Sequence, residues 1–123
     1  MLGIVGSRNF KDYISFKSGI LKVLKEWNIK TENVEGIVSG GALGTDKMAE
    51  QFADEFGIKK YIFPVTKGAY KLYGRAAPLK RNEDIINLST HLIAFPSKSG
   101  SGTQHSISLA NKKGILMKVL FID

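Results

Sequence analysis

The sequence has no cysteine, which excludes disulfide bonds and thiolate zinc sites. It also lacks any apolar run approaching the roughly 20 residues of a membrane-spanning helix. Residues 1–6 have neither the basic start nor the long apolar stretch of a secretory signal peptide. We therefore expect a cytoplasmic protein that has no membrane partner.

Acidic residues are absent from one long stretch, residues 56–82. The formal net charge of the chain is +7, and this stretch holds seven basic residues: Lys59, Lys60, Lys67, Lys71, Arg75, Lys80 and Arg81. Such a concentration is either a solvated basic surface or a field that draws anions toward one edge of the fold. The second interpretation favours a phosphorylated ligand or a nucleic acid as partner.

Short apolar runs alternate with amphipathic segments along the chain, a pattern typical of α/β proteins. The expected strands are residues 2–5, 36–38, 61–63, 91–95 and 116–122. The expected helices are one capped by Asp12 and three over residues 45–56, 78–88 and 103–113. Residues 65–77 show no convincing period and are expected to form a long loop. The length predicts a single domain over residues 1–123.

The expected strands are apolar runs rather than alternating patterns, which favours a parallel sheet covered by helices on both faces. We predict an α/β, Rossmann-like, doubly wound and mostly parallel five-stranded sheet with strand order 3-2-1-4-5. In such sheets ligands bind beyond the carboxyl ends of the strands, where the winding reverses. Here that place lies between the first and fourth strands.

A glycine-rich turn joins the second expected strand to the second expected helix. Gly40, Gly41 and Gly44 permit a tight turn and leave room for a ligand close to the backbone. The helix that begins there presents unpaired N–H groups and the positive end of its dipole, which suit a phosphate. The hydroxyls of Ser39 and Thr45 could hold the same phosphate.

Two further turns, after the first and fourth strands, should converge on the glycine-rich turn. The first contains Gly6, Ser7 and Arg8, whose guanidinium could bind a phosphate or a carboxylate through two hydrogen bonds. The candidate ligand-binding residues of the other turn are Ser99, Gly100, Gly102 and Thr103. Three flexible turns at one crevice predict an anion-binding site more strongly than any one of them alone.

Three polar residues near these turns have two interpretations each. Asp46 lies in the first turn of its helix, where it either complements the dipole or bonds to a ligand hydroxyl. Arg81 and Asn82 stand near the start of the third helix, where they could close over the crevice or form a polar surface.

Several familiar motifs are missing from the sequence. It contains no Gly-Lys-Ser/Thr of a P-loop and no Gly-x-Ser-x-Gly elbow. The dinucleotide fingerprint is present only as Ser39-x-Gly41-x-x-Gly44, without a ribose-binding acid about 20 residues later, which disfavours classical NAD binding. His91 is expected to be structural, and His105 has no nearby acid or second histidine with which to bind a metal. We expect no cofactor and no metal.

Four motifs follow one another in order along nearly the whole chain: Gly6-Ser7-Arg8-Asn9-Phe10, Ser39-Gly40-Gly41-Ala42-x-Gly44-Thr45-Asp46, Arg81-Asn82, and Ala94-Phe95 with Ser99-Gly100-x-Gly102-Thr103. Together they resemble the YspA/YpsA-related branch of the SLOG superfamily, which also holds the DprA/SMF proteins and the LOG nucleotide phosphohydrolases. The resemblance implies a Rossmann-like fold that binds nucleotides or nucleotide derivatives, as a sensor or as a processing enzyme.

One departure from the LOG enzymes bears on catalysis. Those enzymes carry Pro-Gly-Gly-x-Gly-Thr-x-x-Glu, whose glutamate helps to cleave the bond between base and ribose. Ser106 stands at the position of that glutamate, and the arginine that partners it corresponds to Arg81. Glycosidic cleavage needs a carboxylate. The acid in these turns is Asp46, so the candidate catalytic residues are Asp46 and Arg81.

Three functional hypotheses follow. The leading one is binding of a nucleotide or phosphorylated nucleotide derivative in the crevice. The second is hydrolysis of a nucleotide or nucleoside phosphate by a LOG-like N-glycosidase. The third is DprA-like binding of single-stranded nucleic acid, with Tyr70 and Tyr73 as stacking platforms beside the lysines. Apolar helix faces could also pair subunits into a homo-oligomer.

Overall fold

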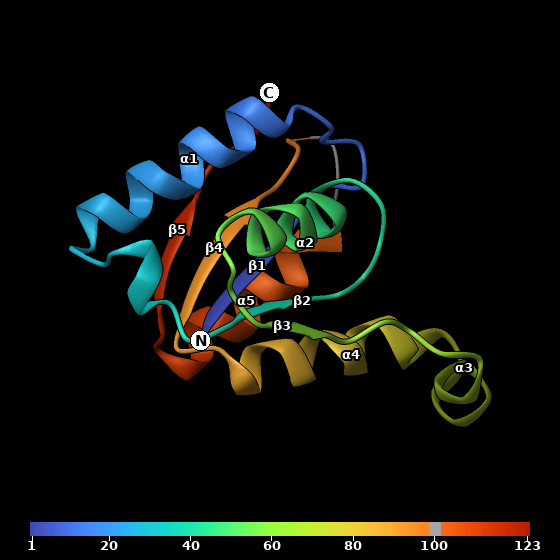
Figure 1. Cartoon of the computed structure of the whole chain (residues 1–123). Coiled ribbons are helices and arrows are strands. Elements are labelled where there is room, and N and C mark those ends of the chain that lie inside the picture. Colours follow the sequence, from blue (N-terminus) through green and yellow to red (C-terminus); the bar gives the residue numbers. More distant parts are fainter. Residues whose placement is uncertain (99–101) are drawn as a thin grey trace.

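The computed structural model describes residues 1–98 and 102–123. Five strands form one sheet: β1 (Leu2–Gly6), β2 (Ile37–Ser39), β3 (Lys60–Ile62), β4 (His91–Phe95) and β5 (Leu116–Val119). The order across the sheet is β3-β2-β1-β4-β5, and each of the four pairings is parallel (Figure 1). The predicted fold and strand order are therefore confirmed.

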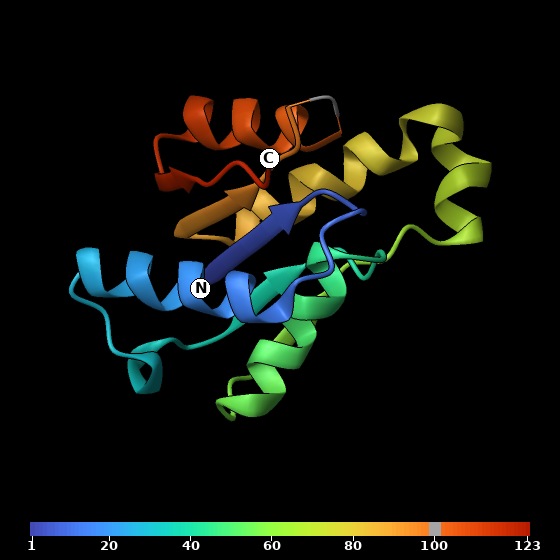
Figure 2. The same ribbon diagram turned by 90° about the horizontal axis from the view of Figure 1, so that it is seen from above.

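Helices cover both faces of the sheet. They are α1 (Tyr13–Glu26), α2 (Thr45–Glu55), α3 (Lys67–Tyr73), α4 (Ala77–Leu88) and α5 (Gly102–Lys113), with short 3₁₀ turns η1 (Thr31–Asn33) and η2 (Gly74–Ala76). Figure 2 shows α1 and α2 on one side of the strands and α4 and α5 on the other. This arrangement follows from right-handed crossovers that start at β1 and wind outward in both directions.

Local signals in the sequence explain where several helices begin and end. The Asp12 carboxylate accepts a hydrogen bond from the Ser15 N–H at 3.2 Å and so caps α1. Pro78 lies in the first turn of α4, where its missing N–H costs no hydrogen bond. Gly114 follows α5 with a φ of +78°, a conformation that ends a helix and favours glycine.

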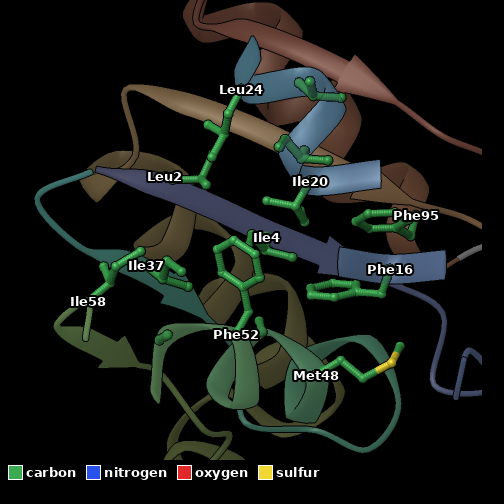
Figure 3. Close-up of a cluster of buried hydrophobic side chains, with 14 residues drawn as sticks. Leu2, Ile4, Phe16, Ile20, Leu24, Ile37, Met48, Phe52, Ile58 and Phe95 are labelled. Carbon is green, nitrogen blue, oxygen red and sulfur yellow. The ribbon is translucent and has the colours of Figure 1, made fainter. Parts of the chain in front are cut away.

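Each face of the sheet has its own buried apolar cluster. In Figure 3, Ile4 of β1 and Ile37 of β2 lie against Phe16 and Phe52 from α1 and α2. Val5, the next residue of β1, belongs to the cluster on the opposite face, with buried side chains from α4 and α5. Because neighbouring residues of one strand are buried on opposite faces, the strands are apolar runs without alternation.

Residues 65–77, predicted to be a loop, are mostly helical. Thr66 caps α3 by accepting a hydrogen bond from the Ala69 N–H at 3.0 Å, and η2 connects α3 to α4. None of the seven residues of α3, all described by the structure, is buried. A helix that buries no face has no apolar period in its sequence, which is why the prediction of a loop was wrong.

Each helix in the described ranges 1–98 and 102–123 is too short or too polar to span a bilayer.

Candidate ligand-binding site

A cavity of about 350 Å³ lies beyond the carboxyl ends of β1 and β4, at the predicted reversal of the winding. Its volume is in the range typical of small-molecule sites. Residues from every predicted turn reach its wall. The predicted site residues that line it are Gly6, Ser7, Arg8, Asp46, Arg81, Asn82, Gly102 and Thr103. Segments far apart in the sequence thus line one cavity.

Other predicted site residues have different positions. The structure places Ser39, Gly40, Gly41, Gly44 and Thr45 in the glycine-rich turn but not among the cavity-lining residues of the described part of the chain. Ser39 and Thr45 are completely buried. Ser99 and Gly100 lie outside the described residues.

The turn after β1 packs directly on the turn after β2. The carbonyl oxygen of Ser7 accepts two hydrogen bonds from Thr45, one from its N–H at 3.2 Å and one from its hydroxyl at 2.9 Å. Gly44 has a φ of +73°, and a Cβ at this position would lie 2.3 Å from the Arg8 carbonyl oxygen. In this structure the glycine and the threonine hydroxyl therefore join two turns, and neither faces the cavity.

Asp46 is held at the cavity wall by the glycine-rich turn. Its carboxylate accepts a hydrogen bond from the Ala42 N–H at 3.1 Å, and the Ser39 hydroxyl lies 3.0 Å from the other carboxylate oxygen. Burial raises the pKa of Asp46 above its usual value. The hydrogen bonds from Ala42 and Ser39 and the charge of Arg81 oppose this rise. The protonated form of Asp46 is therefore more favoured at this wall than it would be in solvent.

The Ser39 hydroxyl links Asp46 to the sheet. It lies 3.0 Å from the Asp46 carboxylate and also 3.0 Å from the Ile4 carbonyl oxygen. A hydroxyl has a single proton, so it donates to one of these acceptors at a time. When Asp46 is protonated, it can donate to Ser39 while Ser39 donates to the Ile4 carbonyl. Each donor in this row of hydrogen bonds then has an acceptor.

Arg81 of α4 ties the helix to the ends of two strands. Its Nη1 donates to the Gly40 carbonyl at 3.0 Å and, in a longer contact of 3.5 Å, to the Phe63 carbonyl. Its Nε donates to the Asn82 side-chain oxygen at 3.1 Å. A Cβ on Gly40 would lie 2.4 Å from Nη1. A side chain at residue 40 would therefore displace the guanidinium from its present position.

The lining of the cavity combines positively polarised groups with apolar side chains. Arg8 is exposed at the rim, and Gly102 and Thr103 begin α5, whose first turn contains no acid. The guanidinium and the amino end of the helix dipole therefore face the same space, which favours an anion. The lining also contains the apolar residues Val5, Ala42, Pro78, Leu79 and Ile85, which can contact an uncharged part of a ligand.

Some lining residues were not predicted as part of the wall. Ser106 lines the cavity because it stands three residues after Thr103 and so shares its helix face, a relation that could have been read from the sequence. Pro78 and Leu79 had no such signal, since their place depends on how α3 and η2 lead into α4. Within residues 1–98 and 102–123, no three His, Asp or Glu side chains are grouped so as to hold a metal ion.

The basic residues of the acid-free stretch occupy several places. Arg81 lines the cavity. Lys59 and Lys60 lie at the amino end of β3, which is the other end of the sheet. Lys67, Lys71 and Arg75 belong to α3 and η2, and Figure 2 shows α3 beyond the carboxyl ends of the strands. Part of the positive charge therefore lies at the end of the sheet that holds the cavity.

Two solved structures share this fold. One is DNA processing protein A (DprA) from Streptococcus pneumoniae, with a TM-score of 0.73 and 22% identity over 96% of this chain and 49% of that chain. The other is DNA processing protein A from Helicobacter pylori, which binds single-stranded DNA, with a TM-score of 0.67 and 23% identity over 96% of this chain and 63% of that chain. The chain thus spans less than two thirds of the length of either protein. No family model and no curated protein matches the sequence.

Replacing Gly44 with alanine should destabilise the protein by about 2–4 kcal/mol, because the new Cβ meets the Arg8 carbonyl at a strained backbone angle. Gly57 also has a positive φ, +64°, but has no atom within 4 Å of the Cβ position. Gly57→Ala should therefore cost only about 1 kcal/mol. Urea unfolding of both variants measures the difference, and equal losses would contradict the proposed contact between the turns.

The raised pKa of Asp46 predicts a pH dependence of stability. The folded state holds this proton more tightly than the unfolded chain. Asp46 therefore lowers the free energy of unfolding as pH rises above about 4, until the carboxyl is ionised. Asp46→Asn should lack this pH-dependent loss of stability because an amide does not ionise. The amide can still accept from Ala42 and donate to Ser39, so the variant should fold. Urea unfolding of both proteins from pH 4 to 8 should show the variant gaining relative stability as pH rises; a constant difference would refute this account.

Proposed function

We propose that the cavity binds a nucleotide or another small phosphorylated nucleotide derivative, as the resemblance to the SLOG superfamily implies. The observation that carries the proposal is the convergence of Arg8, Arg81 and the amino end of α5 on one cavity of about 350 Å³. A phosphate combines the negative charge and the several acceptor oxygens that these donors require.

The two kinds of lining residue suit the two parts of a nucleotide. The phosphate would lie at the amino end of α5, within reach of Arg8 at the rim. The base would lie against apolar lining residues such as Pro78 and Leu79 of α4. Ser39, Gly44 and Thr45 act in this proposal by holding the turns in place, because their polar groups and close contacts are used inside the protein.

Hydrolysis is the less favoured use of this site. Of the cavity-lining residues that the structure describes, Asp46 is the acidic one, and it is 8% exposed. Its two carboxylate oxygens already contact the Ala42 N–H and the Ser39 hydroxyl. Ser106, at the position of the LOG glutamate, is buried and carries no carboxylate. We therefore propose binding, with Asp46 as a structural member of the wall and not as an acid or base.

Isothermal titration with the four ribonucleoside monophosphates, the matching nucleosides and inorganic phosphate tests this function. Saturable binding is expected for at least one monophosphate and should be tighter than for its nucleoside or for phosphate alone. Arg8→Ala should weaken this binding about tenfold, because a charged hydrogen bond contributes about 1.5 kcal/mol or more.

Lys22→Ala is the control for Arg8→Ala, since it removes one exposed positive charge from α1, outside the cavity lining. Its affinity should equal that of the parent protein. A folded parent protein that binds none of the monophosphates, or an equal loss in both variants, would refute the proposed site.

Single-stranded nucleic acid is a second candidate ligand, favoured by the surface of α3. Tyr70 and Tyr73 are 51% and 44% exposed and stand on a helix that also carries Lys67 and Lys71. Exposed aromatic rings beside basic side chains can stack with bases and neutralise phosphates. The shared fold with a DprA protein that binds single-stranded DNA supports this candidate.

Fluorescence anisotropy with a labelled oligothymidine tests the second candidate. Tyr70→Ala and Tyr73→Ala should each weaken binding by about 1–3 kcal/mol, whereas Tyr70→Phe keeps the ring and should bind as the parent does. Affinity should also fall steeply with added salt. Binding that is weak in the parent, or that is unchanged in both alanine variants, would exclude α3 as a nucleic-acid surface.

A further inference from the structure

We infer that Asn82 is a positioning residue, which fixes the Arg81 guanidinium at the cavity and holds His105 as the neutral tautomer with its proton on Nε2. The part of this inference that concerns ligand affinity rests on the proposed function, and the part that concerns His105 does not. The sequence left two roles open for Asn82, closing over the crevice or forming a polar surface, and both ends of its amide lie against protein groups.

The direction of the hydrogen bonds follows from Arg81. A guanidinium only donates, so the Asn82 atom 3.1 Å from Arg81 Nε must be the amide oxygen Oδ1. The amide nitrogen Nδ2 then faces His105 Nδ1 at 3.2 Å. Because Nδ2 also only donates, Nδ1 of His105 must accept with its lone pair. A neutral imidazole with a bare Nδ1 carries its proton on Nε2.

This chain of hydrogen bonds joins three parts of the cavity wall. Arg81 reaches the glycine-rich turn through the Gly40 carbonyl, at 3.0 Å. His105 belongs to the first turn of α5, between the lining residues Thr103 and Ser106. Asn82, which is buried, connects the two. Its amide therefore sets the position of Arg81 relative to the amino end of α5, the two places from which the proposed site attracts a phosphate.

A proton on Nδ1 of His105 does not fit this row of hydrogen bonds. A charged imidazole has N–H groups on both ring nitrogens, so Nδ1 would face the Asn82 Nδ2 as donor against donor. Turning the amide over would move the same conflict to Arg81 Nε. The charged groups among the described lining residues are Arg8, which follows β1, Arg81 from α4 and Asp46 from α2. Arg81 and Asp46 interact with each other. An aspartate in place of Asn82 would accept from both Arg81 and a charged His105.

Nitrogen-15 NMR of the full chain tests the assignment without any ligand. The protein has two histidines, and His91 is an internal reference because it lies at the amino end of β4 beside Thr90. In the parent protein, neutral His105 should show an unprotonated Nδ1. In Asn82→Asp, whose carboxylate can only accept, the Nδ1 signal of neutral His105 should become that of a protonated nitrogen, while the signals of His91 stay unchanged.

Either of two results would overturn the assignment: neutral His105 of the parent protein with its proton on Nδ1, or a tautomer of His105 that Asn82→Asp leaves unchanged. The first measurement uses the parent protein, so it decides the question even if the variant does not fold.

Affinity tests the positioning role. Asn82→Ala should weaken the tightest-binding monophosphate of the titration panel about tenfold, because Arg81 loses one of its fixed acceptors. Asn87→Ala, an exposed change on the same helix, should have no effect. Unchanged affinity in a folded Asn82→Ala protein would overturn the positioning role. If the parent binds no monophosphate while His105 behaves as expected, the proposed function fails and the hydrogen-bond assignment stands.

Discussion

The double hydrogen bond between Thr45 and the Ser7 carbonyl is the contact on which the cavity depends. One backbone oxygen at the end of β1 receives both the N–H and the hydroxyl of the residue that begins α2. Gly44 allows this approach because it has no Cβ to strike the Arg8 backbone. The contact brings the first two turns together and places Arg8 and Asp46 in the wall of one cavity. Gly44 and Thr45 thus support the cavity wall without lining it.

A second connection runs through Arg81, whose guanidinium joins α4 to the turn after β2. Buried cations need several acceptors to replace the water that they lose, and partly buried Arg81 has carbonyl groups from two segments and the Asn82 amide. The same charge counteracts part of the burial effect on Asp46 across the wall. Charged groups at this end of the sheet therefore support one another, and Arg8 at the rim is left accessible to a ligand.

Two surfaces at the same end of the sheet are available to anions, and they differ in kind. The cavity is small and combines a helix amino end with apolar side chains, which suits a compact phosphorylated molecule. Helix α3 instead presents exposed rings and lysines on an open surface, which suits an extended strand. We favour the cavity because its donors converge from separate segments on one concave site.

By itself the sequence determined the strand order, the ends of most helices and the turns that meet at the cavity. Buried strands alternating with helices admit few arrangements when the crossovers are right-handed, and the carboxyl ends of parallel strands must lie together. Only the tertiary structure decided which polar groups form hydrogen bonds within the protein and which face the cavity. The Thr45 hydroxyl bonds to a carbonyl 38 residues away, and α3 is helical without burying a residue. Neither leaves a local pattern in the sequence, because each depends on distances between segments that come together only in the folded chain.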